Sequence, residues 1–393
     1  MKNFIPGHER QSTDLFTRVV AFSFLVGIGL SFKLWVSDRQ FPLAPVHSFF
    51  LSVLQPIDGF LLIVLIGSLV ALLFIKRQWV VVAMLTSLLL LVAEDQMRLQ
   101  PWVYLYFLIF LPFAFSKQPG GAGFISRYLQ WIFVACYLWS GVHKINPNFI
   151  DKTFQDVLGH LFSISLPERY KVFGYVIPFV EITIAFLLVF IKTRKAGVVA
   201  ALSAHLFILL YLSPLGIDRN YVVYPWNIAM ISGVVLLFWR NEETLFIFPK
   251  GMVWRAFQVG SLVLLFVLPL LNLAGRWDHY LSFSLYADKT HHLFIAIEET
   301  EAKKLNGVYD TYVVTLPGVR GGLIIGADQW SMNELHVPVY PETRIFNSIA
   351  RQFCRHDIPE GKMVFMECQL PLSRNALRTF GCDLIRHANY TEP

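Results

Sequence analysis

Long apolar runs fill the first two-thirds of this chain, and they constrain the fold more than any other feature. Between Leu15 and Leu273, hydrophobic stretches are separated only by short polar breaks. Of the 393 residues, 55% are hydrophobic and 15% are charged, whereas a soluble domain carries about 25% charged residues. A bilayer span needs roughly 20 mostly apolar residues. The pattern therefore predicts an all-α, multi-pass transmembrane helix bundle.

The lengths of the apolar runs predict about nine spans. They cover residues 15–35, 57–75, 78–94, 101–116, 125–143, 172–191, 196–213, 221–239 and 254–273. The stretch Phe41–Gln55 is also apolar, but Pro42, Pro45 and Pro56 interrupt it. We expect that stretch to be re-entrant or interfacial. The first run is longer than a signal peptide and no small-residue cleavage site follows it, so we expect it to stay in the membrane.

The composition becomes ordinary after Gly275, which predicts a domain boundary between residues 275 and 276. Residues 1–275 would form the bundle, and residues 276–393 a small β-rich extramembrane domain. Alternating apolar stretches predict strands, and Pro341 opens a predicted helix that runs to Phe353. The predicted strands are Leu293–Ile297, Tyr312–Leu316, Leu323–Ile325 and Met363–Cys368. No catalytic motif is visible there, which favours a structural role or the docking of a protein or peptide partner.

The distribution of lysine and arginine predicts the orientation, because these residues are enriched in cytoplasmic loops. One set of breaks holds Lys2, Arg10, Lys76, Arg77, Lys117, Arg127, Lys192, Arg194, Lys195, Arg240, Lys250 and Arg255. The opposite set holds Arg39, Arg98, Lys144, Lys152, Arg169, Lys171 and Arg219. Twelve against seven favours a cytoplasmic N-terminus. With nine spans, the C-terminal domain would then be extracytoplasmic.

The cysteines limit the possible disulfides, and the distribution of charge limits the possible partners. Cys136 lies in an apolar run, while Cys354, Cys368 and Cys382 lie in the C-terminal part. An extracytoplasmic location would allow one disulfide among those three. No metal-ligand spacing is present. The net charge of +6 is spread over short breaks rather than gathered in a patch, so we expect the lipid bilayer and no nucleic acid as a partner.

Three ionisable residues lie in successive predicted spans: Lys144, Glu181 and His205. Ionisable groups in a membrane are costly and mark functional candidates. At helical spacing, Tyr137, Ser140, Gly141 and Lys144 share one face. Ser140 and Gly141 would let a helix or a ligand approach closely. Lys144 could act as a base in a shared pocket, or it could snorkel to the interface. A structural ion-pair network would give the same pattern.

A second polar group precedes another predicted span. Asp95 and Arg98 are three residues apart and could pair on one helical face, followed by Pro101 and Trp102. From these residues alone, a polar loop with a local salt bridge is the preferred explanation of this group.

The segment Tyr137–Asn146, with Glu181 and His205 in the following spans, resembles the vitamin K-dependent gamma-carboxylase superfamily. That superfamily includes bacterial proteins with a horizontally transferred transmembrane (HTTM) domain. The segment after Asp95 resembles the start of an earlier family helix, and Arg276–Tyr286 resembles the junction into the lumenal domain. The resemblance implies a fold with a lumen-facing active site. DoxX-like proteins, which are small membrane partners of redox enzymes, share part of the helical pattern.

The resemblance also implies a chemistry. Lys144 would be the base that deprotonates a reduced, vitamin K-like quinone, and His143 would replace the other member of the family's basic pair. Glu181 and His205 would orient the base or stabilise charge. The residues expected to contact the cofactor are Tyr137, Ser140, Gly141, Asp95, Arg98 and Trp102. The region after the last span is much shorter than in the carboxylase, which argues against carboxylation of a protein.

Two functions follow from the sequence. The first is a membrane-embedded enzyme that uses a quinol or another lipid-soluble ligand with Lys144 as base. The alternative is a non-catalytic membrane scaffold or redox-partner protein whose C-terminal domain binds a partner. A transporter is less favoured, because the Ser-Gly-Val-His-Lys motif is not repeated elsewhere in the chain.

Overall fold

The chain folds into two compact units, each assembled from segments far apart in sequence. The computed structural model describes residues 7–117, 121–165, 167–218, 220–249, 251–305, 307, 309–315, 322–356, 358–370 and 377–388. The first unit contains Met1–Leu30, Gly59–Leu90 and Gln100–Ala287, and the second contains Ser31–Asp58, Leu91–Leu99 and Asp288–Pro393. The two early segments of the second unit thus belong with the C-terminal part of the chain.

The first unit is a bundle of apolar helices. Its α-helices are α1 (Gly7–Leu30), α4 (Asp58–Phe74), α5 (Gln78–Glu94), α6 (Pro101–Phe110), α7 (Gly121–Lys144), α8 (Gln155–Phe162), α9 (Val176–Val189), α10 (Arg194–Leu212), α11 (Val223–Phe238), α12 (Met252–Leu262) and α13 (Leu268–Asn272). Short 3₁₀ or π segments extend several of them, at Leu111–Phe115, Phe149–Phe154, Glu168–Tyr175 and Val263–Val267.

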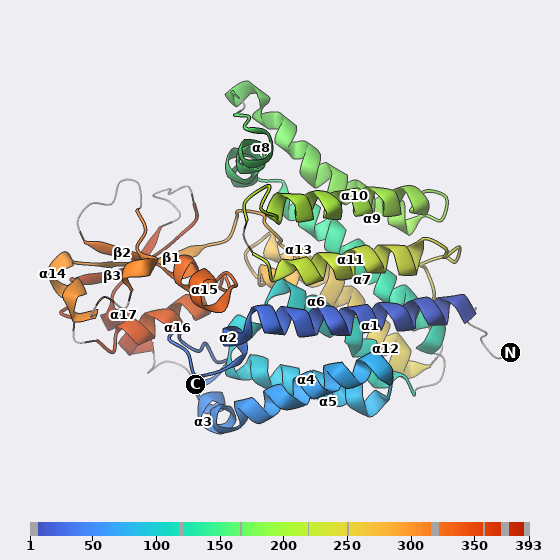
Figure 1. Ribbon diagram of the computed structural model, residues 1–393, viewed down its shortest axis with the longest axis horizontal. Helices are drawn as coiled ribbons and strands as arrows, with labels where there is room; N and C mark the ends of the chain where they lie inside the picture. The colour runs from blue at the N-terminus through green and yellow to red at the C-terminus, as the bar shows by residue number, and fades with distance from the viewer. Residues whose placement is uncertain are drawn as a thin grey trace. The chain divides into compact units, whose positions relative to one another are not determined.

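Small residues set the closest helix contacts in this unit. Helix α7 packs on α9, α1 packs on α11, and α10 packs on both α9 and α11 (Figure 1). A Cβ atom on Gly141 would lie 2.7 Å from the Pro178 carbonyl oxygen and 2.7 Å from Cγ1 of Ile182. Because only glycine tolerates that approach, Gly141 brings the α7 and α9 backbones together.

Five described helical stretches are long and apolar enough to cross a membrane, so the chain is an integral multi-pass membrane protein. They are Glu9–Leu30, Ser48–Phe74, Arg169–Val189, Arg194–Leu212 and Met252–Asn272. Three shorter apolar helices cover Gln78–Glu94, Pro101–Phe115 and Val223–Phe238. The expected count of about nine spans is therefore not confirmed.

Two differences from the predicted spans have a physical reason. Helix α7 is neither one of the five long apolar stretches nor one of the three shorter apolar helices. Arg127, Gln130 and other polar residues lower its mean hydropathy. The stretch Phe41–Gln55 was expected to stay outside the spans, yet Ser48–Phe74 includes its end. Pro56 lies at the start of a 3₁₀ turn, Gln55–Ile57, where a missing N–H breaks no helical hydrogen bond.

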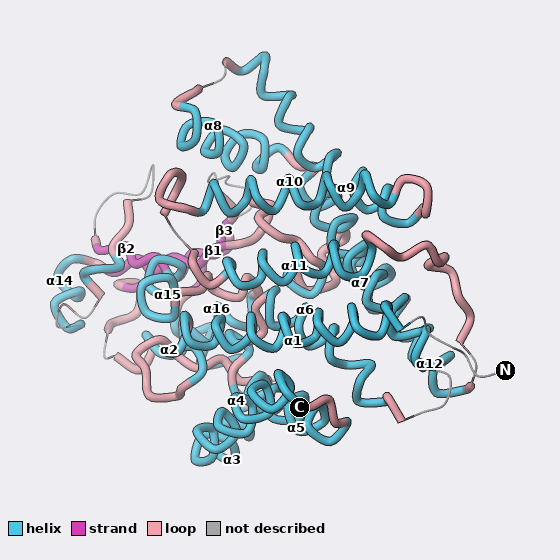
Figure 2. Tube along the Cα trace, turned by 45° about the vertical axis from the view of Figure 1, so that its right-hand side comes forward, coloured by secondary structure: helices cyan, strands magenta, loops and turns pink. Residues whose placement is uncertain are grey.

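The second unit contains a four-stranded antiparallel sheet with the order β2-β1-β3-β4. The strands are β1 (His292–Ile297), β2 (Leu323–Gly326), β3 (Met363–Cys368) and β4 (Arg378–Phe380). In the register, Ile295 of β1 lies opposite Ile325 of β2 and Phe365 of β3. Figure 2 distinguishes the strands, in magenta, from the helices. The pattern predicted β1, β2 and β3 but not the short β4.

The second unit also contains helices. They are α14 (Glu299–Ala302), α15 (Ala327–Leu335), α16 (Thr343–Phe353) and α17 (Cys382–Ala388), and the early segments add α2 (Phe32–Trp35) and α3 (Ser48–Leu54). Helix α16 matches the helix expected from Pro341, but α15 and α17 had no predicted counterpart. The expected strand Tyr312–Leu316 is not formed as a regular strand in the described residues. Its first residue ends the 3₁₀ turn Asp310–Tyr312, and Val313 makes a single bridge to Ile325. Leu316 lies outside the described residues.

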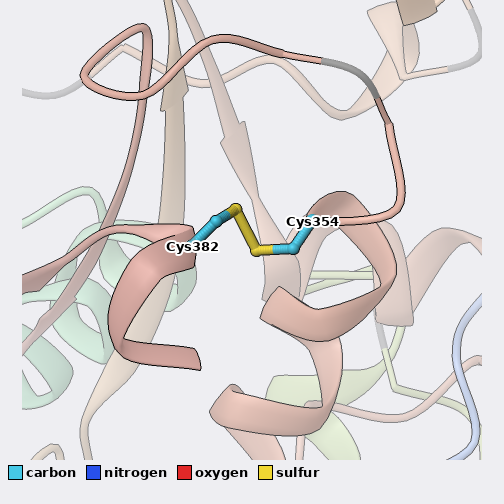
Figure 3. Close-up of a disulfide and its surroundings, with 2 residues drawn as sticks. All are labelled: Cys354 and Cys382. Atoms are coloured by element: carbon cyan, nitrogen blue, oxygen red, sulfur yellow. A yellow bond between two sulfur atoms is a disulfide. The ribbon is translucent and has the colours of Figure 1, made fainter. Parts of the chain in front are cut away.

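A disulfide joins two of these helices. Cys354, directly after α16, is bonded to Cys382 at the start of α17 (Figure 3). Cys136 and Cys368 are buried free thiols. Among the three C-terminal cysteines considered for one disulfide, Cys368 is therefore the unpaired one.

Side chains of the C-terminal part hold both early segments in the second unit. The Glu334 carboxylate accepts hydrogen bonds from the backbone N–H groups of Gln40 at 2.6 Å and Phe41 at 3.0 Å. The Arg344 Nε donates to Oε1 of Gln96 at 2.6 Å. Residues 31–58 and 91–99 are thus structural parts of this unit rather than free connections.

Candidate functional site

An ion pair links α7 to α9 inside the first unit. The Lys144 Nζ lies 3.0 Å from Oε1 and 2.9 Å from Oε2 of Glu181. It also donates to Oγ of Ser140, one helical turn earlier, at 2.6 Å. The Lys144 side chain is 7% exposed and that of Glu181 16%. The three donors of an ammonium group thus have three close oxygen acceptors, in surroundings that exclude most water.

A second chain of hydrogen bonds links α7, α10 and α11. The Tyr137 hydroxyl lies 2.7 Å from Nε2 of His205, and His205 Nδ1 lies 2.8 Å from Oδ1 of Asn227. Asn227 Nδ2 donates to the Val223 carbonyl, which fixes Oδ1 as an acceptor. A neutral His205 then carries its proton on Nδ1 and accepts from Tyr137 at Nε2. Both ring nitrogens are satisfied in that tautomer.

Both groups line one small cavity. Its walls include Tyr137, Ser140, Lys144, Glu181 and His205, and its volume is about 70 Å³. Pockets for drug-sized ligands measure about 300–1,000 Å³. The cavity is therefore much smaller than such a pocket, and its size does not favour a quinone ring. The catalytic roles and the quinone remain predictions.

Other residues of the expected site lie elsewhere in the first unit. His143 is 2% exposed and stacks on Trp139 with 5.8 Å between ring centroids. Gly141 contacts α9. Trp102 is 2% exposed and packs edge-on against Phe24. None of these three is among the residues that line the cavity. Asn227 was not among the expected site residues. Its position as a polar amide in the apolar run 221–239 could have identified it.

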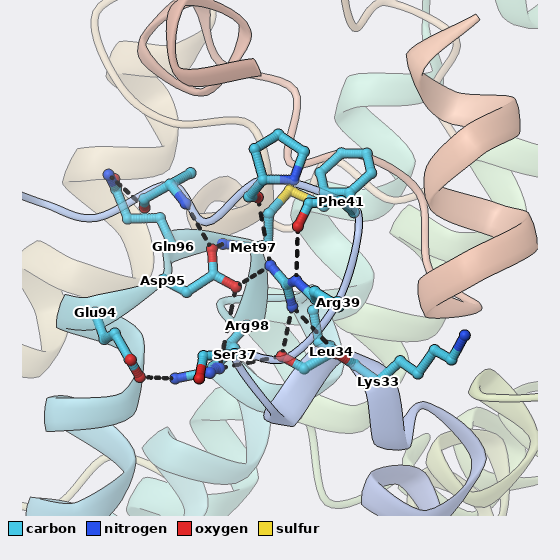
Figure 4. Close-up of polar contacts among 12 residues, drawn as sticks. Lys33, Leu34, Ser37, Arg39, Phe41, Glu94, Asp95, Gln96, Met97 and Arg98 are labelled. Atoms are coloured by element: carbon cyan, nitrogen blue, oxygen red, sulfur yellow. Dashed lines mark hydrogen bonds and ion pairs between the residues drawn. The ribbon is translucent and has the colours of Figure 1, made fainter. Parts of the chain in front are cut away.

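Asp95 and Arg98 belong to a buried cluster in the second unit (Figure 4). Asp95 pairs with Arg39 at 2.5 Å, and Arg98 pairs with Glu94 at 2.6 Å. The direct Asp95–Arg98 approach is longer, at 4.0 Å. All four side chains are fully buried. The partner of Asp95 is thus Arg39, 56 residues away, which helical spacing could not reveal.

Backbone contacts show what this cluster does. Asp95 Oδ1 accepts from the N–H of Ala44 at 3.0 Å, and Arg98 Nε donates to the Leu34 carbonyl at 3.1 Å. Burial lowers the pKa of Arg39 and the attraction of Asp95 opposes that shift. The cluster joins the two early segments of the second unit. The described residues include no group of three or more His, Cys, Asp or Glu side chains suited to a metal ion.

Comparison with known proteins gives one match. The model of a family described as "Methylamine utilisation protein MauE" matches residues 122–222, which is less than half of the chain. The matched region contains Tyr137, Lys144, Glu181 and His205. No curated protein and no solved structure matches the chain.

This match corrects the resemblance drawn from the sequence. The family found is MauE, a membrane protein family, and not the gamma-carboxylase or HTTM family. The resemblance rested on the short segment Tyr137–Asn146 and on single acidic and histidine residues in later helices. A buried lysine on α7 that pairs with a carboxylate on α9 gives the same sequence pattern and requires no shared chemistry.

Proposed function

We propose that this protein is a non-catalytic membrane accessory protein, whose bundle anchors it and whose second unit docks a partner protein. The match to a family of methylamine utilisation proteins is consistent with an accessory role in that process. The partner is then a protein of methylamine utilisation. This proposal corresponds to the scaffold alternative drawn from the sequence.

The contacts of Lys144 carry the proposal. A general base needs a free lone pair within reach of its substrate, whereas the Lys144 ammonium is held by Ser140 and both oxygens of Glu181. The adjoining cavity measures about 70 Å³. A satisfied polar network between packed helices fits a structural role.

The disulfide supports an extracytoplasmic second unit. Disulfides persist in oxidising compartments and are rare in the cytosol, and Cys354–Cys382 lies in this unit. The lysine and arginine bias of the loops favours the same orientation, because Arg39 and Arg98 of this unit lie in the set of breaks with fewer basic residues. A partner would therefore be met on the outer side of the membrane.

Cross-linking of the full-length protein in its native membrane tests both docking and orientation. The exposed lysines Lys303, Lys304 and Lys362 belong to the second unit, and Lys192 and Lys195 flank the start of α10. An amine-reactive cross-linker should join one protein, in near-stoichiometric amount, to the first three lysines. Links formed only through Lys192 and Lys195, or complete reaction without any partner, would refute the proposal.

A growth experiment tests the metabolic context. Deletion of the gene should abolish growth on methylamine as nitrogen source and leave growth on ammonium unchanged. A plasmid copy with Lys144→Met and Glu181→Leu together should restore growth, because these residues act only in packing. Failure of that copy, if it is present in membranes at the normal level, would instead indicate chemistry at Lys144.

A further inference from the structure

A large basic groove lies within the second unit, between residues 37–55 and helix α16. Its volume is about 860 Å³. Its lining includes the side chains of Arg39, Arg344, Arg351, Arg355 and His47, and no aspartate or glutamate among the described residues. Asp95 offsets the charge of Arg39, but Arg344, Arg351 and Arg355 leave an excess of positive charge in the lining. Such a groove attracts anions.

Helix α16 supplies most of the positive charge. Arg344, Arg351 and Arg355 lie at i, i+7 and i+11, so they follow one face from the start of α16 to just beyond its end. The opposite face, with Phe346 and Phe353, is fully buried. The row of arginines is therefore fixed in direction by the core of the unit.

The arginines differ in their contacts. Arg39 is paired with Asp95, and Arg344 donates to Gln96. The Nε of Arg351 is buried and has no hydrogen-bond partner among the described residues, and the same holds for Oδ1 of Asn347 one turn earlier. A buried donor without a partner is costly, which makes Arg351 the strongest point for an anionic ligand.

The other wall of the groove is the start of a membrane span. Val46, Ser48 and Leu51 line it, and the candidate span Ser48–Phe74 begins there. Val46 and Phe49 are each 60% exposed. An arginine row beside the first turn of a span, next to exposed apolar side chains, is the arrangement that attracts anionic lipids.

We propose that this groove binds the phosphate headgroup of an anionic phospholipid, with its acyl chains along the exposed apolar side of α3. Arg351 and Arg355 contact the phosphate, while Arg344 holds the Gln96 side chain and Arg39 holds the Phe41 carbonyl. This site is separate from the proposed docking of a partner protein, and either proposal can fail without the other.

Lipid binding is measured on the full-length protein in detergent by native mass spectrometry. Titration with phosphatidylglycerol should give bound lipid at concentrations where phosphatidylcholine gives none. A basic residue near an anionic surface contributes about 1 kcal/mol, so Arg351→Gln and Arg355→Gln should each weaken binding about fivefold. The double variant should lose about 25-fold. Arg351→Lys, which keeps the charge, should lose less than Arg351→Gln.

Matched controls separate the lipid from other anions. Lys303→Gln removes an exposed charge of the same unit outside the groove and should leave the lipid titration unchanged. Equal binding to wild type and the double variant would overturn the proposal. Displacement of the lipid by an equal concentration of inorganic phosphate would also overturn it, in favour of a soluble anion. Tighter binding of an acidic peptide than of phosphatidylglycerol would overturn it in favour of a protein ligand.

Discussion

Lys144 and Glu181 face each other across the α7–α9 contact, with the Lys144 Nζ 2.9 and 3.0 Å from the two carboxylate oxygens. Neither group has another oppositely charged partner in the described ion pairs of the first unit. The two charges therefore depend on each other, and the pair acts as a single link between two helices.

Removing one member of this pair should destabilise the bundle more than removing both. Lys144→Met leaves the Glu181 charge buried and should cost about 3–5 kcal/mol. Lys144→Met with Glu181→Leu should recover most of that loss, because no unpaired charge remains. Thermal unfolding in detergent measures both. A double variant as unstable as the single one would contradict a structural role for the pair.

The close approach of α7 and α9 predicts a cost at Gly141. Gly141→Ala places a methyl group 2.7 Å from the Pro178 carbonyl oxygen and from Ile182, and should destabilise by about 1–3 kcal/mol through overpacking. Gly67→Ala on α4 is the matched control, because its Cβ would meet nothing within 4 Å. That control should be neutral or slightly stabilising. Equal melting temperatures for the two variants would contradict the packing.

The contact of Glu334 with the first early segment predicts local opening when the carboxylate is changed. Glu334→Gln should raise hydrogen exchange at the amides of Gln40 and Phe41 about tenfold to a hundredfold, since bonds to a charged acceptor contribute about 1.5–3 kcal/mol. Glu299→Gln, an exposed acid of α14, is the control. Unchanged exchange at both amides in Glu334→Gln would show that another group holds the segment.

The disulfide predicts a thiol count. Protein denatured without reductant should present two reactive thiols, Cys136 and Cys368, and reduction should release Cys354 and Cys382 as well. The paired change Cys354→Ser and Cys382→Ser should lower stability by about 2–4 kcal/mol. Four thiols in freshly isolated, unreduced protein would contradict the bond and weaken the extracytoplasmic assignment.

Glu367 predicts a loss of stability in acid. Burial alone would raise its pKa, but hydrogen bonds from His291, Thr343 and Arg378 outweigh burial and leave the pKa lowered. A carboxyl group whose pKa is lower in the folded than in the unfolded protein stabilises the fold at pH values above its unfolded-state pKa. This stability is lost as the pH falls through the folded-state pKa. The loss therefore occurs below about pH 4.3, the usual glutamate pKa.

Substitution at this position tests that window. Glu367→Gln should lower the free energy of unfolding at neutral pH and flatten its decrease in acid. Glu360→Gln changes an exposed acid of the same unit and should keep the wild-type pH profile. Chemical unfolding at a series of pH values measures both. If the free energy of unfolding of Glu367→Gln decreases in acid as steeply as that of the wild type, other carboxylates cause the loss of stability in acid.

Local patterns in the sequence predicted features that depend on near neighbours. Ser140 and Lys144 are four residues apart on one helix, so their contact follows from helical geometry. The strands β1 and β3 followed from alternation of apolar residues. The expected count of about nine spans is not confirmed, because hydropathy cannot show whether Arg127 and Gln130 of α7 face protein or lipid. The resemblance to the gamma-carboxylase superfamily rested on a few polar residues in apolar helices, and the MauE match corrects it.

The amino-acid sequence by itself determined that this chain is a helical, multi-pass membrane protein with polar groups in its helices, because the period and length of apolar runs are properties of neighbouring residues. Only the tertiary structure decided which groups meet. Glu181 reaches Lys144 because Gly141 lets α9 approach α7, and Asp95 lies closer to Arg39 than to nearby Arg98. The early segments 31–58 and 91–99 join the C-terminal unit through Glu334 and Arg344. These contacts depend on chain packing over long sequence separations, which no local pattern encodes.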